Sequence, residues 1–148
     1  GEFRLTGEIV RALTDEPVPE PDSPGLNLAQ LIAVSRRYST WPLINRTQRT
    51  FPALLNDLRA GRGAIVSGDY DQMGVWSCQH SFVGNHAIWV NHISGDGDLY
   101  VSDPLCRVAR EVPVPIIRAY AEKFGRDSGL SAGQLRYAVT RVTSTVEG

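Results

Sequence analysis

The sequence lacks the features that mark several large classes of protein. Its apolar stretches are far shorter than the roughly 20 residues that a membrane-spanning helix needs. Its 15 Lys and Arg residues against 16 Asp and Glu residues give a net charge of −1, which indicates neither a basic nucleic-acid surface nor an acidic tail. Its first residues lack the basic segment and apolar segment of a secretory signal peptide. We therefore expect no membrane span and no nucleic-acid partner.

Cysteine and histidine are also scarce. The two cysteines, Cys78 and Cys106, are too few for a disulfide framework, so they either bridge each other or remain free thiols. His86 and His92 share one predicted strand about 20 Å apart at roughly 3.3 Å per residue, which is too far for one metal ion. The pair Cys78 and His80 lacks a second ligand pair for zinc. We expect no metal and no cofactor.

A length of 148 residues suits a single domain. The first three residues, Gly-Glu-Phe, have the appearance of a cloning scar, which leaves residues 4–148 as the domain. Apolar residues at helical spacing predict a helix over residues 4–13, and four prolines predict a loop over 15–25. A second helix is expected to begin at Asn27 and to end near residues 37–38. A third follows Thr50 and ends at Gly61.

The second half of the sequence changes to strand patterns. Strands are predicted over 64–67, 86–93, 98–103 and 135–142. An irregular polar connection is expected over 69–81, and a helix that begins near Pro113 is expected to end at Gly125. Helices followed by a mainly antiparallel sheet with one inserted helix predict an α+β domain.

The predicted hairpin of residues 86–103 carries the chemistry. A tight turn centred on residues 94–95 would place His86 opposite Asp103. It would likewise pair Ile88 with Val101 and Val90 with Leu99, so that all six side chains share one face. Directly opposed residues have Cβ atoms about 4.5–5.5 Å apart, close enough for an imidazole to bond a carboxylate. Trp89 and Tyr100 would then pair on the opposite face, against a helix.

A histidine backed by a carboxylate is what a thiol nucleophile requires. The histidine lowers the thiol's pKa and later protonates the leaving amine, while the carboxylate fixes the ring and its tautomer. An ordinary cross-strand ion pair is the alternative reading of His86 and Asp103. Cys78 precedes both residues in the chain, but no helix is expected to lower its pKa, so a loop thiol or a bridge to Cys106 is the preferred interpretation.

Three stretches of the sequence together resemble a known family. They read Leu-Arg-Ala-Gly-Arg-Gly-Ala-Ile-Val over residues 58–66, Gly-Asn-His-Ala-Ile-Trp-Val over 84–90 and Val-Ser-Asp-Pro over 101–104. This order resembles the papain-like cysteine peptidases of the bacteriocin-processing type, and is most similar to phage-borne lysin or tail-associated members. Residues 4–7 and 28–30 also have counterparts there.

The resemblance implies a papain-like fold in which His86 is the general base and Asp103 the orienting acid of a Cys-His-Asp triad. The family's nucleophilic Cys, with a Gln just before it, begins an early helix and has no counterpart here. Either both residues precede this chain or the natural protein has lost them. The chain alone is therefore expected to be inactive. Trp76 and Asn85 are the candidates for a substrate groove.

By analogy with the phage-borne members, the function expected is hydrolysis of peptide bonds in the bacterial cell wall. The protein would be phage-encoded, and its substrate would be peptide or peptidoglycan. Two alternatives stay open. One is a non-catalytic relic of the fold that binds cell-wall peptide or a virion partner, which the missing Cys favours. The other is a peptidase that trims leader peptides.

Overall fold

The computed structural model describes Leu28, Ile32 and residues 43–140. The expected scar, the helix over 4–13 and the loop over 15–25 lie outside the described residues. The same holds for most of the helix expected from Asn27 and for the last strand beyond residue 140. Leu28 and Ile32 are both helical. In the described part of the chain, no helix is both long and apolar enough to span a membrane.

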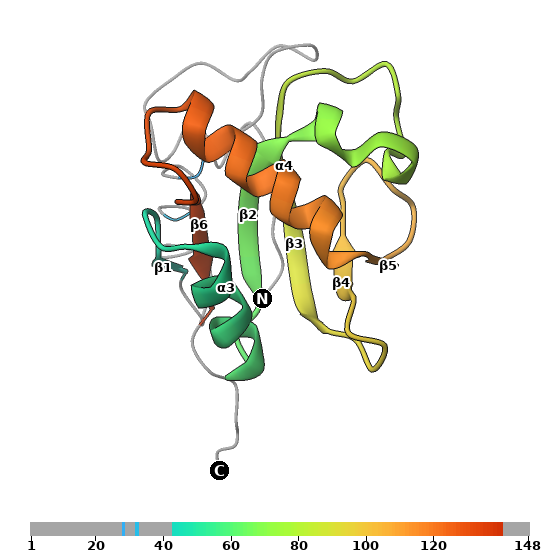
Figure 1. Cartoon of the computed structure of the whole chain (residues 1–148). Coiled ribbons are helices and arrows are strands. Elements are labelled where there is room, and N and C mark those ends of the chain that lie inside the picture. Colours follow the sequence, from blue (N-terminus) through green and yellow to red (C-terminus); the bar gives the residue numbers. More distant parts are fainter. Residues whose placement is uncertain (1–27, 29–31, 33–42, 141–148) are drawn as a thin grey trace, which may run out of the picture.

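The described chain forms a six-stranded antiparallel sheet with the strand order β1-β6-β2-β3-β4-β5 (Figure 1). Its strands are β1 (Ile44–Asn45), β2 (Ala64–Asp69), β3 (Asn85–Ile93), β4 (Leu99–Ser102), β5 (Arg110–Val112) and β6 (Tyr137–Val139). The four predicted strands are all present: β2 and β3 are longer than predicted, and β4 and β6 are shorter. The short strands β1 and β5 were not predicted, because two or three residues carry too little periodicity.

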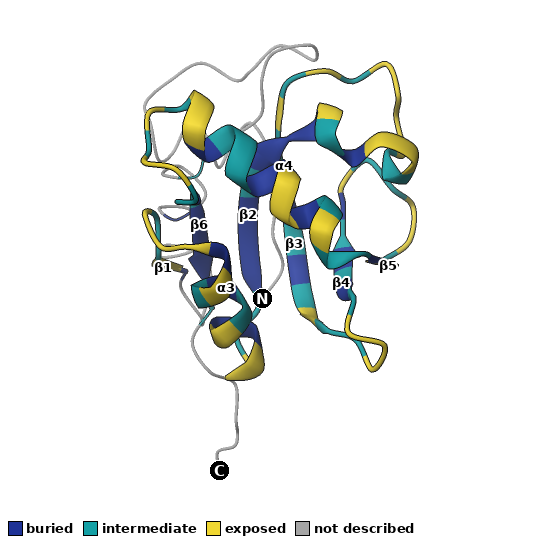
Figure 2. Ribbon diagram, viewed as in Figure 1, coloured by how far each residue is buried: buried dark blue, intermediate teal, exposed yellow. Residues whose placement is uncertain are grey.

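Two helices, α3 (Phe51–Arg59) and α4 (Val114–Asp127), cover one face of the sheet (Figure 1). Both bury apolar residues in the main core, which includes Leu54 and Ile117, while their outer residues are exposed (Figure 2). A smaller cluster on the sheet includes Ile65, Ala138 and Trp89 together with the helical Leu28 and Ile32. Helices packed on a mainly antiparallel sheet confirm the predicted α+β class.

The predicted polar connection after β2 is more ordered than expected. A 3₁₀ segment, η1 (Tyr70–Trp76), occupies its first part. Tyr70 and Met73 are buried in the main core, and the Asp69 side chain accepts a hydrogen bond from the Asp71 amide at 3.0 Å. The connection therefore places the Tyr70 and Met73 side chains in the main core before the chain enters β3.

The hairpin register differs from the prediction. Val90 lies opposite Val101, and Ile93 lies opposite Leu99, with a shift between Val90 and His92. The turn is a five-residue loop in which the Ser94 amide donates to the Asp98 carbonyl, not a two-residue turn at 94–95. Asn91 is the additional residue of the resulting bulge.

The bulge keeps the apolar residues of the hairpin on one face. Ile88, Val90, Leu99 and Val101 all lie in the main core, as predicted, and Ile93 packs against it. On a regular strand, Val90 and Ile93 would point to opposite faces, so the extra residue brings both to the core. The Asn91 amide donates to Ser102 Oγ at 2.9 Å across the strands.

Helix α4 does not end at Gly125, as predicted, but continues to Asp127. A Cβ atom at residue 125 would collide with the backbone carbonyl of Gln134. Glycine is therefore required here by the close approach of a neighbouring segment, and not by a helix end.

The packing of α4 on β2 depends on Gly68, where a Cβ atom would overlap the Tyr120 ring. We expect Gly68→Ala to lower the free energy of unfolding by about 1–3 kcal/mol, because the buried ring must move out of a filled core. Urea unfolding followed by circular dichroism measures this. Gly95→Ala is the matched control, since a Cβ there meets open space and should change stability little. Equal stability of the two variants would contradict this packing.

Candidate active site

His86 and Asp103 lie together at one end of the β3–β4 hairpin. His86 Nε2 is 2.7 Å from Asp103 Oδ1, so the predicted contact is present. The observed register places Asp103 across from Ile88 and not from His86, which makes the contact diagonal. Diagonal neighbours have Cα atoms about 7–8 Å apart. Nε2 is the ring nitrogen farther from the backbone, and it reaches Asp103 across this larger separation. Nδ1 makes no hydrogen bond with Asp103.

Asp103 is buried, with its side chain 0% exposed. Besides His86, the Leu105 amide donates to Oδ1 at 2.9 Å and the Tyr70 hydroxyl donates to Oδ2 at 2.7 Å. A buried carboxylate is costly unless it is well hydrogen-bonded, and here three donors from three segments satisfy it. Asp103 is therefore held rigidly in the orientation that receives the His86 ring.

The three donors decide the charge of Asp103. Burial, the largest influence, acts to raise its pKa, but the hydrogen bonds from His86, the Leu105 amide and Tyr70 together lower the pKa below the ordinary value of 3.8. The carboxylate is therefore ionised at neutral pH and can only accept hydrogen bonds. It follows that Nε2 of His86 carries a hydrogen, and that Nδ1 of the neutral ring holds the lone pair that can take a proton.

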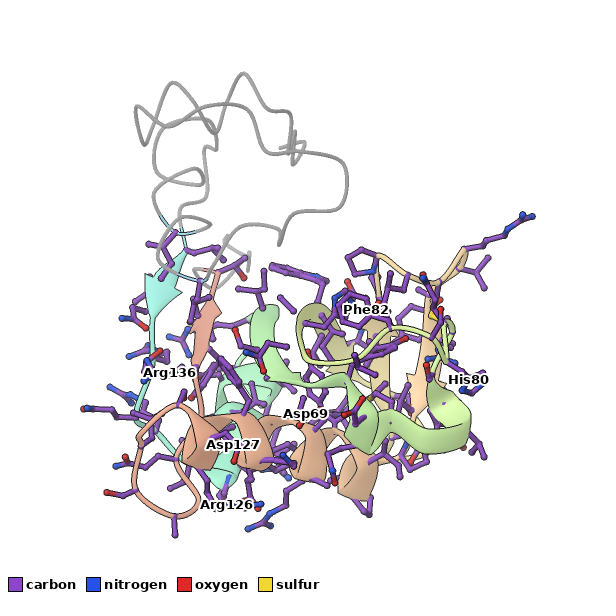
Figure 3. The ribbon with its side chains drawn as sticks, turned by 90° about the horizontal axis from the view of Figure 1, so that it is seen from above. Asp69, His80, Phe82, Arg126, Asp127 and Arg136 are labelled. Atoms are coloured by element: carbon purple, nitrogen blue, oxygen red, sulfur yellow. A yellow bond between two sulfur atoms is a disulfide. The ribbon has the colours of Figure 1, made fainter. Side chains whose placement is uncertain are left out.

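Two aromatic rings enclose the imidazole. Tyr70 and Phe82 each make an edge-to-face contact with His86, with ring centroids 5.0 and 5.3 Å away. Tyr70 and Phe82 also contact each other at 5.6 Å. In Figure 3, His80 lies at the opposite end of the view from Arg136, and Phe82 lies between them. The His86 side chain remains 13% exposed, so the ring is constrained on its flanks but still open to a reacting group.

Tyr120 fixes the backbone beneath the histidine. Its hydroxyl lies within hydrogen-bond distance of the carbonyl oxygens of His86 and Val66, the latter at 3.1 Å. Burial raises the pKa of Tyr120 well above its usual value, so the hydroxyl keeps its proton. Helix α4 therefore ties β2 and β3 together at the point where His86 projects.

A disulfide joins Cys78 and Cys106, whose Cα atoms are 5.4 Å apart (Figure 3). Both cysteines of the chain are bonded to each other, which confirms the preferred interpretation of Cys78. The bridge spans 28 residues, so loop closure alone stabilises the fold by about 3–4 kcal/mol. It connects the loop after η1 to the loop after β4, which are the loops that provide partners for Tyr70 and Asp103.

The sulfur atoms of both cysteines and an Asp103 carboxylate oxygen lie within 4.8 Å of one another. Thiolates bind zinc as separate ligands, whereas these two sulfurs are used in a covalent bond. Asp103 already accepts hydrogen bonds from three donors. While the disulfide is closed, these three residues therefore support the His86 site and do not form a metal site.

The other predicted site residues are more scattered. Trp76 ends η1 and is half-buried against the main core, and its carbonyl accepts a hydrogen bond from Arg110. Asn85 is exposed at the start of β3. Their role in a groove stays a prediction.

The predicted pairing of Trp89 with Tyr100 is wrong. Trp89 lies opposite Ser102, and Tyr100 stacks on His92 with ring centroids 5.1 Å apart. The bulge at Asn91 displaces the two residues from each other. Trp89 does pack on the face opposite His86, in the cluster with Leu28 and Ile32, as expected.

Tyr70 and Phe82 are the site residues that sequence reasoning missed. Tyr70 was not predicted as a partner of the pair, whereas it is 1% exposed and bonded to Asp103. The available signal was its position directly after the buried strand ending Gly-Asp. Phe82 and Val83 follow a polar stretch of this loop, which is a reason to ask what a large apolar side chain there covers.

Comparison with known proteins supports the fold. No protein-family model matches the sequence, and no curated protein matches it significantly. A crystal structure from Bacillus anthracis, provisionally described as a C39-like peptidase, is similar with a TM-score of 0.57 and 10% identity. The alignment covers 84% of this chain and 64% of that one, so the chain spans under two thirds of its structural neighbour. The neighbour is described as a C39-like peptidase, and the chain shares its α+β fold.

The hydrogen bonds to Asp103 predict a pH-dependent contribution to stability. Because folding lowers the Asp103 pKa below 3.8, the contribution is fully present above the unfolded value and is lost as pH falls through the folded value. We expect Asp103→Asn to lower the free energy of unfolding by about 1–3 kcal/mol at pH 7. This difference from wild type should shrink below pH 3.8.

Urea unfolding at a series of pH values measures the difference. Asp96→Asn is the control for loss of one carboxylate, because Asp96 is exposed in the hairpin turn, and it should change stability little at pH 7. A difference between Asp103→Asn and wild type that stays constant down to pH 2 would contradict the stabilised carboxylate.

Proposed function

We propose that this chain carries the general base and the orienting carboxylate of a cysteine-peptidase site, and that the nucleophilic cysteine lies on a segment outside this sequence. The observation that carries the proposal is the 2.7 Å contact between His86 Nε2 and the buried, ionised Asp103. A fold shared with a structure described as a C39-like peptidase supports it.

The roles follow from the two ring nitrogens. Asp103 accepts the hydrogen bond from Nε2 and fixes the tautomer, so that Nδ1 takes the proton from the thiol. The thiolate attacks the peptide carbonyl, and Nδ1 then returns the proton to the departing amine nitrogen. Water hydrolyses the acyl-enzyme with the same histidine acting as the base.

We propose that the substrate is a peptide bond of the bacterial cell wall. We propose further that this chain belongs to a phage-encoded lysin or virion protein. The support is the resemblance of residues 58–66, 84–90 and 101–104 to phage-borne peptidases. A leader-peptide peptidase would use the same residues on a different substrate.

A second candidate is a non-catalytic binding module. It is favoured by one observation, namely that both cysteines of this chain are consumed in the Cys78–Cys106 disulfide. The three hydrogen bonds that hold Asp103 argue against a binding module. They fix the tautomer of His86, which a module that only binds does not need.

The test uses the protein extended by its natural upstream sequence. If a Cys-bearing helix is present there, the extended protein should hydrolyse cell-wall peptide, and His86→Ala should lower the rate by about 100-fold or more through loss of the base. The matched control is His92→Ala, which removes an exposed histidine from the same strand and should retain activity. Circular dichroism checks that both variants fold.

Three outcomes separate the alternatives. Equal activity in His86→Ala and wild type would overturn the catalytic role of this pair. An extended protein that binds cell wall without hydrolysing it would favour the binding module. Cleavage of leader peptides but not of cell wall would replace the proposed substrate with a leader peptide.

This chain by itself should be inactive, because it lacks the nucleophile. Hydrolysis by this chain that Cys78→Ala abolishes would instead identify Cys78 as the nucleophile.

A further inference from the structure

We propose that Tyr70 is a positioning residue of this site, which holds the Asp103 oxygen that His86 does not use and is itself held by the disulfide-closed loop. The inference rests on the proposed function for its catalytic meaning. The contacts that carry it are independent of any nucleophile.

The directions of the hydrogen bonds that join Tyr70 to Cys78 and Asp103 are determined by chemistry. The backbone amide of Cys78 can only donate, and it donates to the Tyr70 hydroxyl oxygen at 2.9 Å. Asp103 is ionised and can only accept, at 2.7 Å from the same hydroxyl. The hydroxyl hydrogen therefore points at Asp103 Oδ2, and the Cys78 amide fixes where the oxygen lies.

Burial makes this arrangement hard to replace. Tyr70 is 1% exposed and Asp103 is 4% exposed, so bulk water cannot take over the contact. Burial is also the main reason that the pKa of Tyr70 is raised above its usual value, which keeps the hydroxyl protonated as a donor. The Tyr70 ring packs edge-to-face on His86, so one side chain positions both members of the pair.

In the described part of the chain, the titratable side chains around Asp103 come from β2, β3, η1 and α4. His86 comes from β3, Tyr70 from η1 and Tyr120 from α4, while Asp69 at the end of β2 is paired with Lys123 of α4 at 2.9 Å. Among these, His86 and Tyr70 donate to the carboxylate itself. Loss of the Tyr70 hydroxyl should therefore raise the Asp103 pKa.

The chain offers a matched control in Tyr137 on β6. Its hydroxyl donates to the buried Asp57 at 3.0 Å, so Tyr137→Phe removes the same kind of tyrosine–aspartate bond away from His86. Both variants keep their rings and should lose stability to a similar degree. A purely structural role for Tyr70 would make the two variants behave alike at His86 and Asp103.

The first experiment is an NMR titration of this chain with labelled Asp and His. In Tyr70→Phe, the Asp103 side-chain carbon should titrate at higher pH than in wild type, and the His86 Nε2 proton should change its chemical shift. Tyr137→Phe should leave both signals in place. Identical signals in wild type, Tyr70→Phe and Tyr137→Phe would overturn the proposal.

A measurement on wild type keeps the test decisive if Tyr70→Phe does not fold. With tyrosine labelled at Cζ, the Tyr70 hydroxyl proton should be visible and slow to exchange, because it is buried and bonded to Asp103. A hydroxyl proton that exchanges as rapidly as that of the less buried Tyr100 would overturn the proposal without any variant.

The second experiment measures kinetics in the extended protein. Tyr70→Phe should lower kcat by about tenfold with KM unchanged, since the imidazole is misplaced while the substrate contacts remain. Tyr137→Phe should keep the wild-type kcat, and an equal fall in both variants would reduce Tyr70 to a stabilising residue. If wild type itself is inactive, the proposed function fails, whereas the NMR titration still decides the role of Tyr70.

Discussion

The buried carboxylate of Asp103 is the group on which the arrangement of this end of the molecule depends. An ionised carboxylate inside a protein must be surrounded by donors, and here they come from η1, β3 and the loop after β4. Each donor requires its own segment to be held in place. The disulfide, the aromatic contacts of Phe82 and the Tyr120 bond to the His86 carbonyl can all be understood as meeting that requirement.

The sequence was sufficient to predict the α+β class and the contact between His86 and Asp103, because alternation and turn residues are local signals. It was insufficient for the register, since a bulge at Asn91 changes the pairing without changing the apolar pattern that was used to predict it. The predicted contact is nevertheless present, because the imidazole reaches its diagonal neighbour Asp103. The correct pair was thus found through an incorrect alignment of the strands.

The misses share a physical cause. Tyr70 acts through its hydroxyl on a residue 33 positions away, and no periodicity reports a contact of that kind. Gly125 was predicted to end a helix because glycine commonly does so, but its absent side chain admits the Gln134 carbonyl. In both cases the tertiary neighbour, and not the local sequence, determines what the residue does.

The histidine–aspartate half of the site is ordered by residues 66–120 without help from a nucleophile. Tyr70, Leu105 and Tyr120 hold Asp103 and the His86 backbone, and the tautomer follows from the charge of Asp103. A catalytic pair oriented in advance avoids reorganisation when the reaction occurs. A thiol brought to Nδ1 would therefore meet a base that is already in place. If the function is as proposed, delivery of the nucleophile is the remaining step that decides whether this site is active.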